Sequence, residues 1–146
     1  MKVVVQRVTS ASVSVNKTVL SSIKDGYLLL VGFQQGDTVN EAQYIASKIA
    51  KLRIFSDKEG KLNLSIKQIN GQILSISQFT LYGDTTKSNR PGFSNALNYK
   101  EADLLYQEFN RILKEEYNII VHSGAFGEHM EIALVNDGPV TIIIEK

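Results

Sequence analysis

Hydroxyl and amide side chains stand where one apolar run of the sequence ends. Residues 72–79 have a strand pattern, and Ser77-Gln78-Phe79-Thr80 stand where its apolar part, with Ile73, Leu74 and Ile76, ends. Uncharged hydrogen-bonding groups at the end of a buried strand can hold a polar substrate rigidly. The same side chains can instead satisfy backbone groups at the strand end, which the pattern alone favours.

A second candidate segment is Asn136-Asp137-Gly138-Pro139-Val140-Thr141, which separates two further apolar runs. Its composition is typical of a tight turn between two strands. A bond before proline costs only about 0.5–1 kcal/mol to place in cis. A cis bond between Gly138 and Pro139 would direct backbone carbonyls outward, and the glycine would let a ligand approach closely. The pattern leaves both interpretations open.

The two histidines give a weaker signal. His122 and His129 are separated by six residues, and Glu128 and Glu131 flank the second. A carboxylate-assisted site can be built from them, but metal-ligand geometry is specific, and polar loop residues are the favoured interpretation. No serine has nucleophile-elbow spacing and no phosphate-binding glycine motif is present, so we predict no metal and no cofactor.

Composition limits the class of protein. The chain has 146 residues, which predicts one domain over 1–146. Its 16 Lys+Arg and 15 Asp+Glu give a net charge of +1, so a nucleic acid would have to meet a local basic patch. It has no cysteine, and its apolar runs are shorter than the ~20 residues that span a bilayer. We therefore expect a soluble, cytoplasmic protein without membrane partners.

The elements that must position these segments alternate along the chain. Thr38 and Glu41 have capping-box spacing and predict a helix over 38–52. Asn98 and Glu101 predict a second helix, which we expect to stop near Asn118. A polar loop is expected over 82–95. The predicted strands are 3–8, 12–16, 18–23, 27–31, 53–56, 72–79, 119–121, 131–135 and 140–145. This order predicts an α/β (α+β) domain with a mixed β-sheet and two main helices.

Taken together, the two candidate segments resemble the D-aminoacyl-tRNA deacylases, also called D-tyrosyl-tRNA deacylases. The hallmark motifs of that family, Ser-Gln-Phe-Thr and Asn-x-Gly-Pro-Val-Thr, stand complete at 77–80 and 136–141. The resemblance runs essentially end to end. It includes 6–8, 11–13, 53–57, Gly60, Lys61, Asn63, Arg90, Pro91, Phe93, Ala102, Gly124, Phe126, Gly127 and Met130.

Three positions depart from the usual pattern of that family. Ser88 stands where glycine is common, Tyr99 where proline often begins a helix, and Glu128 where alanine is usual. We expect the first two to adjust loop geometry only. Glu128 is expected near the pocket, where it would affect substrate preference.

The resemblance implies a fold, an activity and an assembly. The fold would be the barrel-like one of the D-Tyr-tRNA deacylases. The activity would be hydrolysis of the ester that joins a D-amino acid, or glycine, to the 3′ end of tRNA. The assembly would be a homodimer in which a cis Gly138-Pro139 unit, held by Arg7, projects into the partner's pocket. Its carbonyls would reject L-amino acids.

The resemblance also assigns roles within the pocket. Backbone N–H groups near Phe79 and Thr80 would stabilise an oxyanion, while the ribose 2′-hydroxyl helps a water molecule attack. Thr80 as a nucleophile is the less favoured route, because no base stands beside it in the sequence. The expected substrate-binding residues are Arg7, Ser77, Gln78, Phe93, Ala102, Phe126, Met130, Asn136, Gly138 and Pro139.

Several interpretations remain open at this stage. Phe79, Phe93, Phe126 and Met130 can shape an adenine pocket or belong to the core. For contact with tRNA, we expect Lys87 and Arg90 beside the site, whereas plain solvation is favoured for Lys51.

Two other classes of function compete with the deacylase. One is a different hydrolase that uses His122 or His129. The other is a nucleic-acid-binding module without catalysis, suggested by a resemblance to a chromatin-associated animal protein. That reading would require a basic tail, none follows Lys146, and we expect no DNA partner.

Overall fold

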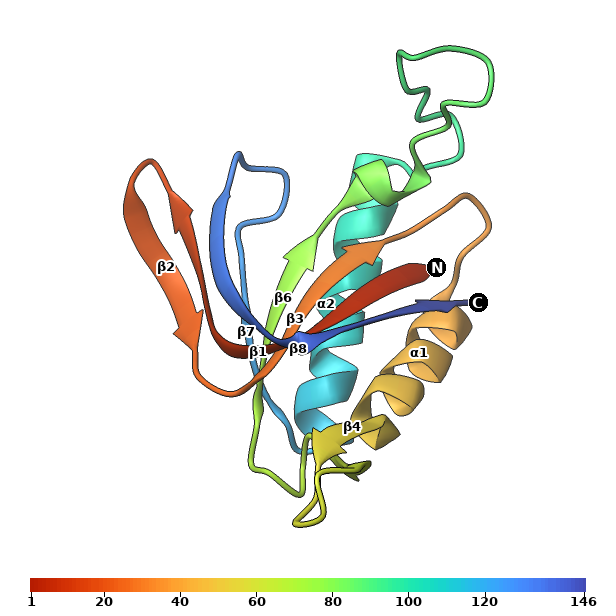
Figure 1. Cartoon of the computed structure of the whole chain (residues 1–146). Helices are drawn as coiled ribbons and strands as arrows, with labels where there is room; N and C mark the ends of the chain where they lie inside the picture. The colour runs from red at the N-terminus through yellow and green to blue at the C-terminus, as the bar shows by residue number, and fades with distance from the viewer.

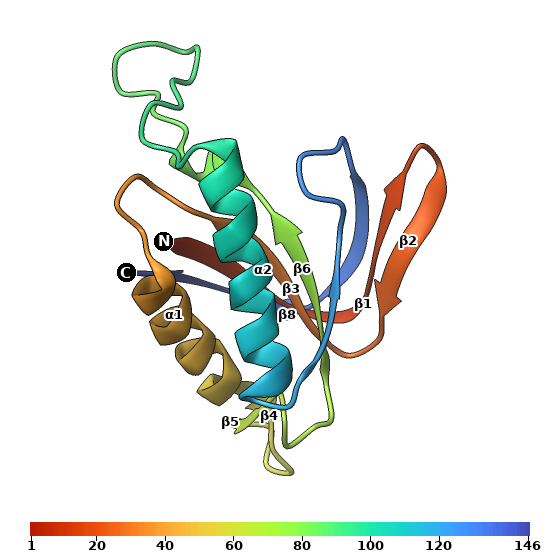
Figure 2. The same cartoon turned by 180° about the vertical axis from the view of Figure 1, so that it is seen from behind.

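The computed structural model describes all 146 residues and shows a curled, mixed β-sheet with two helices on its outer face (Figures 1 and 2). Hydrogen-bonded strands follow the order β2-β1-β3-β6-β7, and β8 pairs with β1. The expected fold class is therefore confirmed. The elements are β1 Lys2–Val15, β2 Thr18–Ile23, β3 Gly26–Gly32, α1 Val39–Lys51, β4 Arg53–Ser56, β5 Leu62–Ser65, β6 Gln72–Ser77, α2 Tyr99–Glu115, β7 Ile120–Ser123 and β8 Glu131–Glu145, with a 3₁₀ turn at Phe79–Tyr82.

The first and last strands are longer than the sequence predicts. β1 and β8 are each continuous and run antiparallel along almost their whole length. Of the two interpretations of 136–141, a tight turn between two separate strands is therefore wrong, because this segment lies inside β8. Val8 pairs with Asn136 and Gln6 with Thr141, so residues 137–140 stand opposite Arg7 alone. The segment is a large bulge, whose two flanks both keep their ladder with β1.

The first helix begins as its capping signal predicts. The Thr38 hydroxyl accepts a hydrogen bond from the Asn40 N–H, and the Glu41 carboxylate accepts one from the Thr38 N–H at 2.8 Å. These bonds satisfy backbone donors that the first turn leaves without acceptors. The buried face of α1 carries Ala42, Ile45, Ala46, Ile49 and Ala50 and packs toward the sheet.

The second helix also begins at its predicted cap, where the Asn98 side chain accepts from the Glu101 N–H. It ends at Glu115, three residues before the expected stop, and Asn118 follows with a positive φ of 53°. That left-handed conformation, which asparagine tolerates well, turns the chain toward β7. The buried face of α2 carries Tyr106, Phe109, Ile112 and Leu113.

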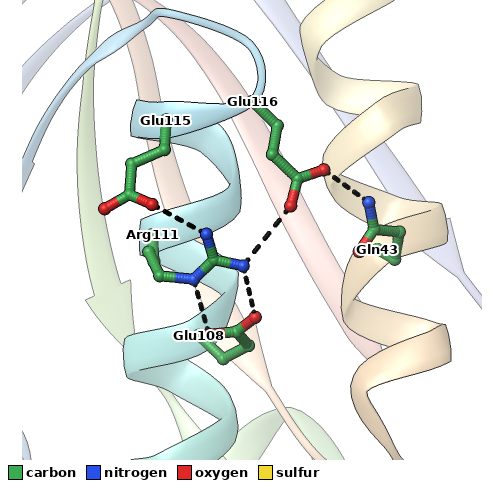
Figure 3. Close-up of polar contacts among 5 residues, drawn as sticks. All are labelled: Gln43, Glu108, Arg111, Glu115 and Glu116. Carbon is green, nitrogen blue, oxygen red and sulfur yellow. Dashed lines mark hydrogen bonds and ion pairs between the residues drawn. The ribbon is translucent and has the colours of Figure 1, made fainter.

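The two helices are also joined by an exposed polar network (Figure 3). Arg111 contacts Glu108 at 2.7 Å, Glu115 at 2.8 Å and Glu116 at 3.4 Å, all on or just after α2. Glu116 in turn accepts a hydrogen bond from the Gln43 side chain of α1 at 2.6 Å. Because exposed ion pairs contribute little individually, this network fixes the orientation of the helix ends more than it stabilises the fold.

The sheet curls around a second, smaller core. The main core of 22 buried residues lies between the sheet and the helices. Seven further buried residues fill the inside of the curl, among them Val13, Leu74 and Ile76. The parallel neighbours β3 and β6 are consequently buried on both faces, as their continuous apolar runs indicate. No helix of the structure is long and apolar enough to cross a membrane.

Candidate active site

A cavity of about 530 Å³ opens at the edge of the sheet where β3 and β6 end. Its walls come from these strand ends, the first turns of α2, and the segment that leads into β8. Ten of its sixteen lining residues are hydrophobic, so a few polar groups would orient a bound molecule. Six of the predicted site residues line it: Ser77, Gln78, Phe79, Ala102, Phe126 and Met130.

The first motif reaches the cavity because β6 ends earlier than the sequence predicts. The Gln78 N–H donates to the Val31 carbonyl at 2.7 Å, and the chain then leaves the ladder in a 3₁₀ turn. The first N–H groups of such a turn have no acceptor within it, which leaves those of Phe79 and Thr80 as donors. The Thr80 side chain is exposed, lies outside the cavity lining and accepts a hydrogen bond from the Gln78 amide.

Two aromatic pairs stand beside the cavity. Phe79 and Phe93 meet edge to face with ring centroids 5.0 Å apart, and Tyr99 and Phe126 do so at 5.1 Å. Phe79 is 57% exposed, so this ring is not a core residue. Phe93 lies outside the lining and packs against Phe79, which is part of it. The rings offer apolar edges and faces that suit a nucleobase.

The second motif is held by a buried guanidinium. Arg7 is 6% exposed; its Nη1 donates to the Ile54 carbonyl at 2.6 Å and its Nε to the Asp137 carbonyl at 3.1 Å. The Asp137 carboxylate lies 3.0 Å from the same Nε. Gly138 and Pro139, joined by a cis peptide bond, stand exposed just beyond this anchor.

Only glycine fits at Gly138. Its φ of +125° lies in a region that L side chains rarely adopt. A Cβ there would also lie 2.9 Å from Cγ2 and 3.0 Å from the backbone nitrogen of Val140. The sequence pattern of a glycine before a proline is therefore explained by the shape of the bulge.

The two motifs do not meet within one chain. Arg7, Asn136, Gly138 and Pro139 are absent from the cavity lining. Arg7 pairs with Tyr27 at the start of β3, whereas Val31 lines the cavity at its end. Four residues at about 3.3 Å each separate these points by about 13 Å along the strand. The structure thus brings together the first motif and the aromatic residues, but not the second motif.

The cavity lining also includes residues that the sequence did not identify as substrate-binding. Tyr99 lines the cavity, although it was expected only to adjust a loop; its position as the first residue of α2 was the available signal. Glu128 also lines the cavity, near the pocket as expected. His129 lines it too, while His122 does not. No group of three or more His, Cys, Asp or Glu side chains lies close enough to hold a metal ion.

Two groups with shifted pKa values, Tyr106 and Asp84, lie outside the cavity lining. Burial raises the pKa of Tyr106, whose hydroxyl donates to the Ser75 carbonyl at 2.7 Å. The backbone N–H of Thr86 lowers the pKa of Asp84, whose backbone exchanges two 2.8 Å bonds with Gly92. Both interactions are structural: the first supports β6, and the second closes the loop that presents Phe93.

The basic residues considered for contact with RNA lie in two separate places. Lys87 and Arg90 are exposed on the loop between the 3₁₀ turn and α2, and that loop also carries Phe93. Lys51 is exposed at the last residue of α1, beside β4 and at the other end of the molecule (Figure 1). Only the first two lie on the side where the cavity opens.

Comparison with known proteins supports one family. The model of the D-Tyr-tRNA(Tyr) deacylase family matches residues 4–145. A D-aminoacyl-tRNA deacylase from Staphylococcus haemolyticus is 54% identical, over all of this chain and 96% of its own length. One from an Exiguobacterium species is 51% identical, over all of this chain and 99% of its own length.

Two solved structures share the fold. A structure described as a c-Myc DNA Unwinding Element Binding Protein has a TM-score of 0.95 and 39% identity, covering 100% of this chain and 99% of its own. A probable eukaryotic D-amino acid tRNA deacylase has a TM-score of 0.84 at 16% identity, covering 98% and 97%, and this likeness shows the fold alone.

A curled mixed sheet with two helices on its outer face defines the structural class, which the two solved structures share along nearly their full length. The chain belongs to the D-aminoacyl-tRNA deacylase family. It is therefore a hydrolase of that class.

Proposed function

We propose that the cavity binds the 3′-terminal adenosine of tRNA with its ester-linked D-amino acid or glycine, and that the enzyme releases free amino acid and free tRNA. The observation that carries this proposal is the position of Ser77, Gln78 and Phe79 on the cavity wall, where the family motif meets the end of β6. The cavity volume of about 530 Å³ suits one aminoacylated nucleoside.

Hydrolysis of the ester requires the protein mainly to position the substrate. Water adds to the ester carbonyl, the acyl–oxygen bond breaks, and the ribose 3′-oxygen leaves as a hydroxyl after taking up a proton. The N–H groups of Phe79 and Thr80 have no acceptor within the 3₁₀ turn and suit the developing oxyanion. The neighbouring ribose 2′-hydroxyl helps the water attack, because the bound ester holds it beside the carbonyl.

Thr80 is better suited to positioning than to nucleophilic attack. A hydroxyl nucleophile needs a base that takes its proton. The neighbour of Thr80 is the Gln78 amide nitrogen, which donates a hydrogen bond and cannot accept a proton. This contact supports the RNA-assisted route.

Rejection of L-amino acids is assigned to the second motif acting in a partner subunit. Gly138 and Pro139 are exposed, rigidly anchored through Arg7 and Asp137, and do not line the cavity of their own chain. In a homodimer, their carbonyls would enter the partner's cavity and tolerate the α-hydrogen where an L side chain would clash. Glycine, which has no side chain, would pass this filter.

The surface of β8 supports such an assembly. Val135 and Ile143 are 56% and 63% exposed on the strand that carries the motif. Pairing of two chains through this region would cover both apolar side chains. We further propose that the whole chain, residues 1–146, acts as one cytoplasmic deacylase domain that meets tRNA through the basic loop with Lys87 and Arg90.

The direct test is deacylation of matched D-Tyr-tRNA and L-Tyr-tRNA at low enzyme concentration, with glycyl-tRNA as a third substrate. We expect rapid loss of the D-tyrosyl and glycyl esters and retention of the L-tyrosyl ester. Loss of both tyrosyl esters would contradict the proposal that Gly138 and Pro139 reject L-amino acids. Loss of none from a folded sample would favour a binding module without catalysis.

A hydrolase that depends on histidine is the second candidate, because His129 lines the cavity. The variant His122→Ala/His129→Ala separates the two mechanisms. The RNA-assisted route predicts a kcat within about threefold of the parent, since neither imidazole takes part in proton transfer. A loss of about 100-fold or more, typical of removing a general base, would establish the histidine route instead.

A further inference from the structure

Tyr99 is an exposed aromatic residue at the mouth of the cavity. It is the first residue of α2, lines the cavity and is 63% exposed. Large exposed aromatic side chains need a reason when they stand beside a binding site, because their burial by a ligand is strongly favourable. The core does not require this ring.

The ring is nevertheless fixed in place. Its edge-to-face contact with Phe126 has a centroid distance of 5.1 Å and an interplanar angle of 74°. Phe126 itself rests on Tyr106, 5.6 Å away. On the other side, the ring lies on the backbone of Gly127, where a Cβ would stand 2.6 Å from Tyr99 Cε2. Tyr99 is therefore a preorganised flat surface, and binding to it costs little ordering.

The size of the cavity limits what can lie on that surface. A volume of about 530 Å³ takes one aminoacylated nucleoside, so the rest of the tRNA strand must leave through the mouth. The nucleotide that precedes the terminal adenosine is then the first group outside. The exposed carboxylate of Glu128 also lines the cavity, so an uncharged base suits this part of the mouth.

We propose that Tyr99 is a stacking platform for the nucleobase next to the terminal adenosine, which makes it a substrate-binding residue for the acceptor end of tRNA. The proposal rests on the function proposed above and adds a second nucleotide subsite to it. Stacking on an aromatic face tolerates different bases, so the contact adds affinity without demanding a particular base.

The test compares two substrates, one with and one without the nucleotides that precede the terminal adenosine. One is D-tyrosine esterified to the trinucleotide CCA, and the other is D-tyrosyl-adenosine. The variants are Tyr99→Leu, which keeps an apolar contact without a ring, and Tyr99→Phe, which keeps the ring. Tyr44→Leu is the matched control, because Tyr44 is 42% exposed on α1 and does not line the cavity.

We expect Tyr99→Leu to raise KM for the trinucleotide ester about tenfold with kcat unchanged, and to change KM for D-tyrosyl-adenosine less than about twofold. Tyr99→Phe and Tyr44→Leu should match the parent on both substrates. Equal losses on the two substrates would overturn the proposal, since the ring would then only shape the cavity. No loss on either would overturn it as well.

The same assays distinguish a failure of the deacylase assignment from a failure of the Tyr99 stacking proposal. If the parent enzyme hydrolyses neither substrate nor D-Tyr-tRNA, the deacylase assignment itself fails. If the parent hydrolyses both substrates with equal KM, the deacylase assignment stands and the second subsite is absent.

Discussion

The two motifs of this chain occupy opposite environments. Residues 77–80 stand at the edge where β3 and β6 end, and three of the four line the cavity. Residues 136–141 contain the bulge of β8, at 137–140 opposite Arg7, and line no part of that cavity. One motif therefore lines a cavity of its own chain. The other is exposed and lines no part of that cavity, and in the proposed homodimer it would complete the site of the other copy.

The two segments are also held differently. The first is fixed by the last ladder bond of β6 and a short 3₁₀ turn, and its Thr80 side chain remains exposed. The second is anchored by the buried guanidinium of Arg7, which satisfies the carbonyls of Ile54 and Asp137. A steric filter has to be rigid, and a buried charged hydrogen-bond donor gives that rigidity. The difference in anchoring fits the difference in proposed role.

The largest expected effect comes from Pro139→Ala. The pyrrolidine ring fixes φ at this residue, so its loss lets the adjoining carbonyls move. We expect the ratio of D-Tyr-tRNA to L-Tyr-tRNA deacylation rates to fall about 100-fold, with the D-substrate rate little changed. Single-turnover assays on both esters measure this ratio. An unchanged ratio would remove the second motif from chiral selection.

A substitution in the cavity wall tests the opposite case, in which the second motif stays intact. Ala102→Leu adds three carbon atoms to the wall that α2 contributes and leaves the bulge untouched. Overpacking of this kind costs about 1–3 kcal/mol, so we expect D-substrate kcat/KM to fall about 30-fold. The ratio of D to L rates should stay within about threefold of the parent. A loss of selectivity in this variant would show that the cavity itself reads chirality.

Arg7→Ala tests whether the guanidinium of Arg7 holds the bulge of β8 in place. Removing the guanidinium leaves two carbonyl groups without their donor, and we expect the free energy of unfolding to fall by about 2–4 kcal/mol. Because the bulge loosens, the ratio of D to L rates should fall about tenfold. Urea denaturation and the paired assay measure the two effects.

Arg53→Ala is the control for this variant. Arg53 is exposed and also donates to a backbone carbonyl, that of Asn63 at 2.7 Å. Its removal should change stability by less than about 1 kcal/mol and leave selectivity intact. Equal effects of the two substitutions would contradict the special role of Arg7.

The smallest effect is expected from the basic loop. Lys87→Ala/Arg90→Ala should weaken tRNA binding about threefold to tenfold for D- and L-aminoacyl forms alike, and reduce the salt dependence of binding. Lys51→Ala is the matched control and should bind as the parent does. If Lys51 carries the salt dependence instead, tRNA crosses the other end of the molecule.

Local signals predict much of this fold. Thr38 with Glu41 and Asn98 with Glu101 mark both helix starts, and the apolar runs give the strands of the parallel part of the sheet. Tertiary pairing explains what the sequence does not indicate. The bulge at 136–141 stays inside β8 because β1, more than a hundred residues earlier, supplies partners on both of its sides. A turn signal carries no information about such a partner.

The sequence likewise predicts part of the cavity lining. The motifs place Ser77, Gln78 and Phe79 correctly on the cavity. Tyr99 and His129 escape prediction because their position depends on how α2 and the segment before β8 pack against the strand ends. The separation of the two motifs is likewise a property of the whole sheet.

The measurement that tests the central claim most directly is complementation between subunits. Ala102→Leu chains, with an impaired cavity and an intact motif, are co-expressed with Pro139→Ala chains, which have the reverse, and the mixed dimer is isolated through two different tags. If the motif acts on the partner's cavity, the mixed dimer has one complete site and hydrolyses D-Tyr-tRNA while sparing L-Tyr-tRNA. If the mixed dimer hydrolyses both esters as the Pro139→Ala enzyme does, each motif acts within its own chain and the claim is contradicted.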